Sequence, residues 1–581
     1  MNLNYPAAVA ELAVVLIALL AAAALPRSFI EPLSGRIGAL GRFVPAAAWA
    51  QVLIVAVTAI AARAIILPWL GAPVPLVHDE HSHMLLADTF LQGRLSNPAH
   101  PFREHFESFH IIVEPTYSSM FFPGRALPMV IGELLLGHPW AGVWLSFAGL
   151  AAATVWMLRG WLPANWAFLG GLLIVGRLGL YSFWINSYWG GAVTALGAML
   201  VAGAFPRLLA RPRLRDGVFL GAGVLLLLVT RPFEGFFLCV GLGLFILPRL
   251  WRMGAVQLRS LAIRGAVPLL VLGSAGAGLL AAHNEATTGS AFETPYTLNR
   301  NVYAVSPAFL TQDRLIPEDR SFNRMDHVRA FYRGWEPIAY RMVQRNPLEY
   351  FRLLLRKLVL TWQFYLGWSL LIPFLAGLWL LRREPMVLGT LILFIPAMWI
   401  TPWPRPHYFA PIFPLILLPA MAGLAAMSAR KARLRVLAAM LAGATALTGP
   451  IMATLSLTTG WPRLEPNYWD AACCATVTTF PKSEVEARLA QLPGSDLVLV
   501  RATPASPAHS EVVYNVADID AAPVVWARSL GPDKDAVLRR YFSGRQVWIF
   551  EWLPAEPSET TIPPYSLIKA GDSRTRDGAI D

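Results

Sequence analysis

The stretch Val77-His78-Asp79-Glu80-His81-Ser82-His83 decides how the rest of the chain is interpreted, because it follows directly after a long apolar run. Two adjacent carboxylates lie among three histidines, just beyond a segment long enough to cross a bilayer. A carboxylate in this place, held by neighbouring histidines or by a metal ion, can accept a proton from an attacking hydroxyl group. The alternative interpretation is a solvated acidic pair at the end of a helix.

The composition indicates a polytopic membrane protein. Of 581 residues, 56% are hydrophobic and only 14% are charged, whereas a soluble protein carries about a quarter charged residues. Apolar runs of about 20 residues recur along most of the chain, and each is long enough to cross a hydrocarbon core of about 30 Å. Most of the net charge of +12 comes from arginines in short loops between these runs. Such charge sets membrane orientation, so nucleic acid is not an expected partner.

The basic loops alternate with less basic ones, which predicts about twelve membrane helices with both termini on the outer face. The predicted fold class is therefore a polytopic α-helical membrane protein with a small C-terminal α/β domain outside the membrane. Residues 1–43 are expected to form an extra helix, at about 8–26, and a cytoplasmic loop, and residues 44–456 the main membrane domain. The other expectations are spans at 166–185 and 265–283, outer loops at 71–125 and 284–355, and a short interfacial helix at 126–137.

Beyond residue 460 the hydropathy drops, and residues 457–581 are expected to form the outer α/β domain and a tail. Short runs of β-branched and aromatic residues predict strands at 496–501, 511–515, 523–526 and 545–550, with a helix at 533–541. The last 25 residues or so are polar and are expected to be loosely ordered.

Polar residues in the middle and at the end of the run at 166–185 form a second candidate group. Asn186 and Tyr188 lie in a polar segment that can bind substrate, although aromatic residues at a helix end also form interfacial belts. Arg177 lies inside the apolar run, where a charge costs about 2.5–3.5 kcal/mol unless it is paired or reaches water. Its expected partner is either a carboxylate, such as Glu133, or a lipid phosphate.

Arginines at two other helix ends are candidates for binding the phosphate of a lipid-linked donor. Arg231 is followed by Glu234, which is a candidate for substrate binding. Arg405 is followed by His407 and Tyr408, which are further candidates for phosphate binding. The planar guanidinium group matches the oxygen atoms of a phosphate, and prolines around Arg405 prevent regular helix. The alternative is a simple ion pair between Arg231 and Glu234 that caps the helices. Together with a carboxylate base, these residues predict a donor in which the sugar is linked to an isoprenoid phosphate. The arginines would stabilise the negative charge that develops on this phosphate as it leaves.

The histidine-rich loop supplies further candidates. His81, His83 and Asp88 are expected to contact substrate, and His78, His81 and His83 could ligate a divalent metal ion with the neighbouring carboxylates. The spacing of these histidines matches no established zinc motif, so metal dependence stays open. No other cofactor is expected.

These motifs resemble the GT-C superfamily of integral-membrane glycosyltransferases. The resemblance rests on the Asp79-Glu80 pair early in the first large outer loop, on His83-Met-Leu-Leu-Ala-Asp88 and Gly93-Arg94-Leu95 after it, and on His407-Tyr408-Phe409-Ala410-Pro411. Within this group the chain is similar to bacterial protein O-mannosyltransferases and to the lipid A aminoarabinose transferase. The resemblance covers roughly residues 45–455.

The resemblance implies transfer of a sugar from a polyprenyl-phosphate-linked donor to an acceptor hydroxyl, with inversion at the anomeric carbon. It implies that Asp79 is the general base and that Glu80 supports it or binds substrate. The acceptor is a lipid, a polysaccharide or a protein. The expected location is a bacterial inner membrane, with the active site and the C-terminal domain facing the periplasm.

Two alternatives are a transporter or flippase for a lipid or amphiphile, and a non-catalytic envelope assembly protein. Transporters commonly show internal repeats and broken helices that meet at the midplane. Here no clear repeat is visible, and the polar residues gather at one end of the apolar runs. This pattern favours the transferase.

Overall fold

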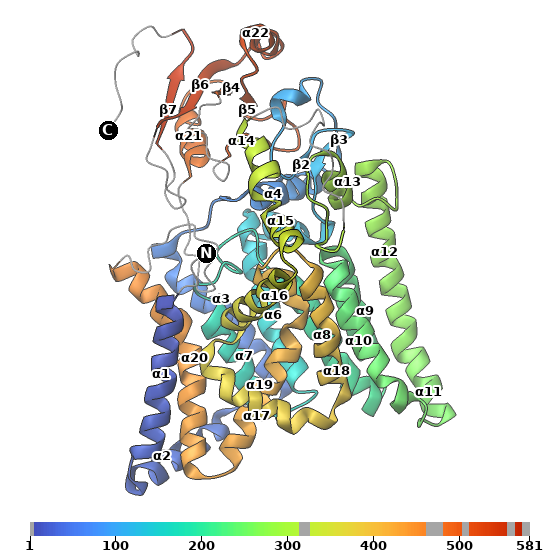
Figure 1. Ribbon diagram of the computed structural model, residues 1–581, viewed down its shortest axis with the longest axis vertical. Coiled ribbons are helices and arrows are strands. Elements are labelled where there is room, and N and C mark those ends of the chain that lie inside the picture. The colour runs from blue at the N-terminus through green and yellow to red at the C-terminus, as the bar shows by residue number, and fades with distance from the viewer. Residues whose placement is uncertain (1–4, 313–325, 460–479, 502–510, 555–563, 572–581) are drawn as a thin grey trace. The chain divides into compact units, whose positions relative to one another are not determined.

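The computed structural model describes residues 5–312, 326–459, 480–501, 511–554 and 564–571, and within it the chain forms two compact units (Figure 1). The first, called the membrane unit below, comprises Met1–Ala72, Leu135–Leu279 and Leu348–Thr476. The second, called the loop unit, comprises Pro73–Leu134, Leu280–Pro347 and Val477–Asp581. Each unit is built from three separate segments of the chain.

The membrane unit is almost entirely helical. Its helices are α1 (Tyr5–Ala24), α2 (Arg27–Leu40), α3 (Ala48–Leu70), α6 (Pro139–Leu158), α7 (Ala164–Leu178), α8 (Ala192–Ala210), α9 (Leu214–Thr230), α10 (Pro232–Leu250), α11 (Ala255–Leu261), α16 (Leu348–Tyr365), α17 (Leu371–Leu380), α18 (Pro385–Ile400), α19 (Phe413–Ala429) and α20 (Ala432–Thr459). Short 3-10 turns are η1 (Gly41–Phe43), η6 (Trp368–Leu370), η7 (Leu381–Arg383) and η8 (Pro406–Ile412). Helix α12 (Val267–Thr288) continues α11 through the π-turn η4 (Ala262–Ala266) and extends into the loop unit.

Seven helices within the described residues are long and apolar enough to cross a membrane, and the number rises to nine if each of two bent pairs is one span. The bent pairs are residues 11–24 with 27–43, and 348–365 with 368–383, bent by 117° and 93°. Helices α7 and α18 are apolar but shorter. The membrane class is confirmed, whereas the number of about twelve spans stays a prediction.

Several boundaries differ from the sequence-based expectations. The segment 27–43, expected to be a loop, is helix α2. Helix α7 ends at Leu178 rather than at 185, and the expected span at 265–283 is the C-terminal part of a continuous helical segment from 255 to 288. The described part of the expected loop 284–355 contains the three helices α13, α14 and α15, and α16 begins at Leu348. The short helix expected at 126–137 is present as α5 (Leu127–Leu136).

The loop unit combines short helices with two small sheets. Its elements are α4 (His78–Leu91), β1 (Asn97–Pro98), η2 (Arg103–Phe106), β2 (Ile111–Ile112), β3 (Thr116–Ser119), η3 (Pro123–Arg125), α13 (Pro295–Val302), α14 (Asp326–Arg329), the π-turn η5 (Ala330–Trp335), α15 (Ile338–Arg345), α21 (Pro481–Leu489), β4 (Asp496–Arg501), β5 (Val524–Arg528), α22 (Pro532–Tyr541), β6 (Gln546–Trp552) and β7 (Tyr565–Lys569). The larger sheet has the order β5-β4-β6-β7, with β4 parallel to β5 and β6, and β7 antiparallel to β6. Strand β4 is buried except at its last residue, as expected for a central parallel strand.

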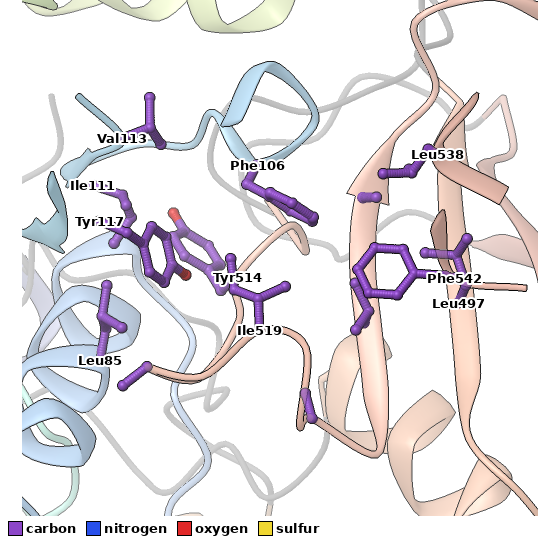
Figure 2. Close-up of a cluster of buried hydrophobic side chains, with 14 of the residues drawn as sticks. Leu85, Phe106, Ile111, Val113, Tyr117, Leu497, Tyr514, Ile519, Leu538 and Phe542 are labelled. Atoms are coloured by element: carbon purple, nitrogen blue, oxygen red, sulfur yellow. The ribbon is translucent and has the colours of Figure 1, made fainter. Parts of the chain in front are cut away.

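One hydrophobic core joins the three segments of the loop unit. Leu85 of α4 and Tyr303, at the end of α13, belong to the same buried cluster as Leu497 of β4 and Leu538 of α22. Figure 2 shows Leu85, Ile111, Val113 and Tyr117 on one side of this cluster and Leu497, Leu538 and Phe542 on the other, with Tyr514 and Ile519 between them. The C-terminal segment therefore packs with the two long loops, whereas the sequence-based division assigned both loops to the membrane domain.

The C-terminal predictions are confirmed in part. Strands β4, β5 and β6 and helix α22 form where they were expected. The strand predicted at 511–515 is wrong, because this segment runs without regular structure. Residues 565–569, which were expected to be loose, form the edge strand β7. Residues 555–563 and 572–581 of this tail lie outside the described residues.

Candidate functional site

Asp79 and Glu80 begin helix α4, and the structure gives them different partners. The Oε2 atom of Glu80 accepts hydrogen bonds from the backbone N–H groups of Leu76 and Val77 at 2.9 and 3.0 Å. This is the capping arrangement in which a residue of the first turn satisfies donors that the helix leaves unpaired. Glu80 thus stabilises the start of α4, while its neighbour Asp79 points in another direction around the helix.

Asp79 pairs with His110, a histidine that the sequence analysis did not single out. The Nδ1 atom of His110 lies 2.7 Å from Oδ1 of Asp79, and the two side chains are 12% and 13% exposed. His110 has a φ of 60°, a left-handed conformation that is uncommon for residues other than glycine. Such conformations persist where the surrounding structure enforces them, and they are enriched at functional sites.

The backbone of His110 is held by neighbours on several sides. Its carbonyl oxygen accepts hydrogen bonds from Oγ of Ser82 at 2.8 Å and from the backbone N–H of Met120 at 3.2 Å. The Oγ atoms of Ser82 and Ser119 lie 2.7 Å apart, which links α4 to β3. The ring of His110 also packs against the edges of Phe121 and Phe331. These contacts fix the imidazole beside the carboxylate.

The environment of Asp79 keeps its carboxylate ionised. Burial is the largest single influence and raises the pKa, but His110 opposes it through its charge and its hydrogen bond, and His83 and His78 act in the same direction. The net result is a pKa well below the usual value for aspartate. At neutral pH this side chain is an anion held next to an imidazole, an arrangement that can accept or orient a proton.

The three histidines proposed as metal ligands point into different surroundings. His81 stacks on Tyr514 with ring centroids 4.2 Å apart, His83 faces Phe121 at 4.5 Å, and His78 packs against Phe109 at 4.7 Å. Among the described residues, no group of three or more His, Cys, Asp or Glu side chains is arranged to hold a metal ion. The histidines therefore do not fit a shared metal site, and no chemical step below involves a metal.

His81 and Asp88 both connect α4 to the C-terminal segment of the loop unit. Burial, together with the charge of Lys482, lowers the pKa of His81 to about 3, although Glu511 acts in the opposite direction. The stacked imidazole is therefore neutral at physiological pH. The Oδ2 atom of Asp88 accepts a hydrogen bond from the backbone N–H of Ala517 at 2.6 Å. The role of His81, His83 and Asp88 in substrate binding stays a prediction.

In the membrane unit, the predicted phosphate-binding residues gather around η8. This short helix packs against α8, α10 and α16. Arg231 lies between α9 and α10, where Pro232 begins the next helix. Its Cζ atom lies 3.8 Å from the centroid of the Tyr408 ring, and its Nη1 atom lies 3.8 Å from Oε1 of Glu234. The Arg231–Glu234 pair predicted as the alternative is present, but the guanidinium group also stacks on an aromatic face.

The second arginine of this cluster follows the same pattern. The Cζ atom of Arg405 lies 5.2 Å from the ring of Trp189, which in turn lies 4.5 Å from the ring of His407. His407 is fully buried and also packs on Tyr408 at 4.6 Å. We call Arg231, Arg405, His407, Tyr408 and Trp189 the arginine–aromatic cluster. In this cluster two guanidinium groups pack on aromatic rings at the ends of apolar helices.

Lys357 of α16 is a buried cation that the sequence analysis missed. It is fully buried, and its Nζ atom donates to the carbonyl oxygens of Met398 at 2.8 Å and Trp399 at 3.4 Å, and to that of Thr401. These are carbonyl groups at the end of α18, which the helix itself leaves unpaired. Lys357 lies just beyond the end of the outer loop expected at 284–355, so its position in the sequence did not indicate that it would be buried.

Arg177 pairs with a carboxylate of the protein, which is one of the two predicted alternatives, but the carboxylate is Glu11 and not Glu133. Its Nη1 atom pairs with Oε1 of Glu11 in α1, and it also donates to the carbonyl oxygens of Gln363 and Phe364. The second oxygen of Glu11 accepts a hydrogen bond from the backbone N–H of Trp368 at 2.8 Å. Arg177 thus joins α7 to α1 and to the bend after α16. Phosphate binding by Arg177 stays a prediction.

Asn186 is engaged in the framework of the membrane unit. Its Oδ1 atom accepts from Nε of Arg63 at 2.9 Å, and its Nδ2 atom donates to the carbonyl oxygen of Leu180 at 2.9 Å. Arg63 is fully buried in α3, and its Cζ atom lies 4.6 Å from the ring of Trp140. Tyr188 is also buried. Substrate binding by Asn186 and Tyr188 stays a prediction.

Comparisons with known proteins give structural likenesses only. No protein-family model and no curated protein sequence matches the chain. Among solved structures, the chain is similar to ArnT from Cupriavidus metallidurans bound to undecaprenyl phosphate, with 14% identity, a TM-score of 0.48 and coverage of 87% of this chain and 94% of that one. It is also similar to the oligosaccharyltransferase of Archaeoglobus fulgidus in the apo form, with 11% identity, a TM-score of 0.44 and coverage of 88% and 70%.

These likenesses concern the fold alone.

Proposed function

We propose that this protein is a membrane glycosyltransferase that moves a sugar from a polyprenyl-phosphate-linked donor to an acceptor hydroxyl. The observation that carries the proposal is the buried, ionised Asp79 held 2.7 Å from His110 at the start of α4. The arginine–aromatic cluster supports it, because paired guanidinium groups suit the charge of a lipid phosphate. The proposed location is the periplasmic face of a bacterial inner membrane.

The proposed reaction is a single displacement. The acceptor oxygen bonds to the anomeric carbon while its proton passes to Asp79, and the bond between the anomeric carbon and the phosphate oxygen breaks. Polyprenyl phosphate leaves with the bonding electrons, and Arg231 and Arg405 stabilise its developing charge. His110 holds Asp79 in position through the contact between its Nδ1 atom and the carboxylate. Glu80 acts through the geometry of α4, since its oxygen caps the helix.

Replacement of Arg231 tests the phosphate-binding role. We expect Arg231→Ala to lower kcat/KM for a polyprenyl-phosphate-sugar donor by about 10²-fold or more, because a charge-assisted contact to the leaving group is lost. Arg231→Lys should recover only part of the activity, since an ammonium group cannot form the planar paired contact. The measurement is the transfer of radiolabelled sugar by purified protein in lipid.

The control for this variant is Arg249→Ala at the other end of the same helix. Arg249 pairs with Glu384, and both side chains are more than a third exposed, at 40% and 36%. Activity close to wild type is expected there. Equal losses in the Arg231 and Arg249 variants would contradict a specific role for Arg231.

Replacement of His110 tests its support of Asp79. Because His110 lowers the pKa of Asp79, removing the imidazole raises that pKa, and protonation of Asp79 then begins at a higher pH. We expect His110→Asn to reduce kcat by about 10-fold to 10²-fold and to move the acidic limb of the pH–rate profile to higher pH. Asparagine is chosen because it tolerates the left-handed backbone at this position.

The matched control is His100→Asn, since His100 also pairs with a carboxylate, Asp520, at 3.0 Å in the loop unit. Asp520 is half exposed, at 50%, so little change in rate and no shift of the acidic limb are expected. An unshifted limb in the His110 variant would remove this histidine from the support of the base.

A further inference from the structure

Helix α2 and the turn between α19 and α20 form an exposed basic surface that the proposed reaction does not use. Helix α2 is bent by 117° from α1, so it does not continue the apolar direction of that helix. It packs against α20, which Figure 1 shows beside it. Ile30 and Ser34 are the buried side chains of this helix. Ile37 and Ala39 are half-buried, and the other residues of α2 are exposed.

The exposed side of α2 carries apolar and basic residues on one face. Phe29, Leu33, Arg36 and Leu40 are spaced i, i+4, i+7 and i+11, which places them along one stripe of a helix. Phe29 is 67% exposed, Leu40 62%, and Phe43 in the following turn 74%. Single exposed apolar residues are normal, but a stripe of large ones with an arginine inside it is typical of helices that lie in a membrane interface.

The positive charge extends from α2 to the neighbouring turn. Five exposed cations form what we call the basic edge: Arg27, Arg36, Arg42, Arg430 and Lys431. Residues 26–46 and 428–435, which contain them, hold a single carboxylate, Glu31. Within the described residues, no carboxylate lies within ion-pair distance of any of the five.

Two further arginines of this region are already committed to the fold. Nη1 of Arg433 donates to the carbonyl oxygens of Ala22 and Ala23 at 2.8 and 2.6 Å, at the end of α1. Nε of Arg435 donates to the carbonyl oxygen of Ser428 at 2.9 Å. These bonds tie the end of α1 and the α19–α20 turn to α20. The basic edge therefore lies on a framework that arginine hydrogen bonds hold in place.

We propose that the basic edge binds the headgroups of anionic phospholipids, with the apolar stripe of α2 inserted among the lipid chains. Large apolar side chains beside arginines suit a site where the chain region and the headgroup region of a bilayer meet. The absence of nearby carboxylate partners leaves the five cations to attract the phosphate groups of anionic lipids. A soluble acidic partner would not require the exposed Phe29, Leu40 and Phe43.

The test is lipid retention by the purified full-length protein, measured by native mass spectrometry during titration with phosphatidylglycerol or phosphatidylcholine. The wild type should retain phosphatidylglycerol in preference to phosphatidylcholine. In the variant Arg27→Gln, Arg36→Gln, Arg42→Gln this preference should fall by about tenfold, since each basic residue at an anionic surface contributes severalfold in affinity. Raising the salt concentration should weaken the preference of the wild type.

The control variant is Arg211→Gln, Arg252→Gln, Arg259→Gln, which removes three exposed arginines from other loops of the membrane unit. It should keep the preference for phosphatidylglycerol. Equal retention of the two lipids by the wild type would overturn the proposal. So would an unchanged preference in the α2 variant, or an equal loss in the control, which would indicate diffuse attraction by net charge. Thermal unfolding in detergent without added lipid checks that each variant is folded.

Discussion

Replacing Asp79 with asparagine should lower the rate of sugar transfer by about 10²–10⁴-fold, the range that a positioned general base contributes. The amide is similar in size to the carboxylate but cannot accept the proton of the acceptor hydroxyl. It also leaves His110 without its anionic partner at 2.7 Å. KM for the donor should change little, because the proposed contacts to the phosphate come from other residues. The measurement is steady-state transfer of labelled sugar with purified, folded protein.

Glu80→Gln is the matched control for this experiment. The amide oxygen of glutamine can still accept the hydrogen bonds that Leu76 and Val77 donate to Glu80. We therefore expect a much smaller loss of rate than for Asp79→Asn. If the two variants lost activity equally, the separate roles that the structure gives to these neighbouring carboxylates would be wrong.

Removing Glu11 should have the largest effect on stability. Glu11→Ala leaves the guanidinium group of Arg177, which is only 7% exposed, without its anionic partner. Breaking a buried ion pair in this way costs about 3–5 kcal/mol in the free energy of unfolding. The expected result is a large drop in the midpoint temperature of unfolding in detergent. This midpoint can be measured from the loss of the monodisperse peak in size-exclusion chromatography after heating.

A second, more exposed ion pair serves as the control for the effect of burial on stability. Glu384→Ala breaks the more exposed pair with Arg249 and should cost about 1 kcal/mol or less. The double replacement Glu11→Leu with Arg177→Met should recover much of the stability, because well-packed apolar residues can replace a buried pair. A loss for Glu11→Ala no larger than that for Glu384→Ala would contradict the structural role of Arg177.

The features that depend on local sequence were predicted well. Apolar runs identified most of the membrane helices, because a span must be apolar along its whole length. Short runs of β-branched and aromatic residues identified β4, β5 and β6. Asp79 was found because it directly follows such a run. Helix α2 was missed because Pro32, Gly35 and Gly38 within it disfavour helix.

The features that depend on distant contacts were not visible in the sequence. Glu11 and Arg177 are separated by 166 residues, so no spacing rule connects them. His110 was one of six histidines in its loop, and only the fold brings it to Asp79. The three chain segments of the loop unit belong together because they share one hydrophobic core, and the hydropathy of the sequence does not reveal this core. A charged residue in an apolar run, such as Arg177, predicted the existence of a partner but not its identity.

The most direct test of the central claim is the fate of the donor in vesicles that contain the purified protein, a polyprenyl-phosphate-linked sugar and an acceptor mixture. The account predicts that polyprenyl phosphate is released in equal amount to the sugar transferred, and that Asp79→Asn stops both. Movement of the intact lipid-linked sugar across the bilayer without cleavage, at the same rate in wild type and variant, would contradict it and identify a transporter instead.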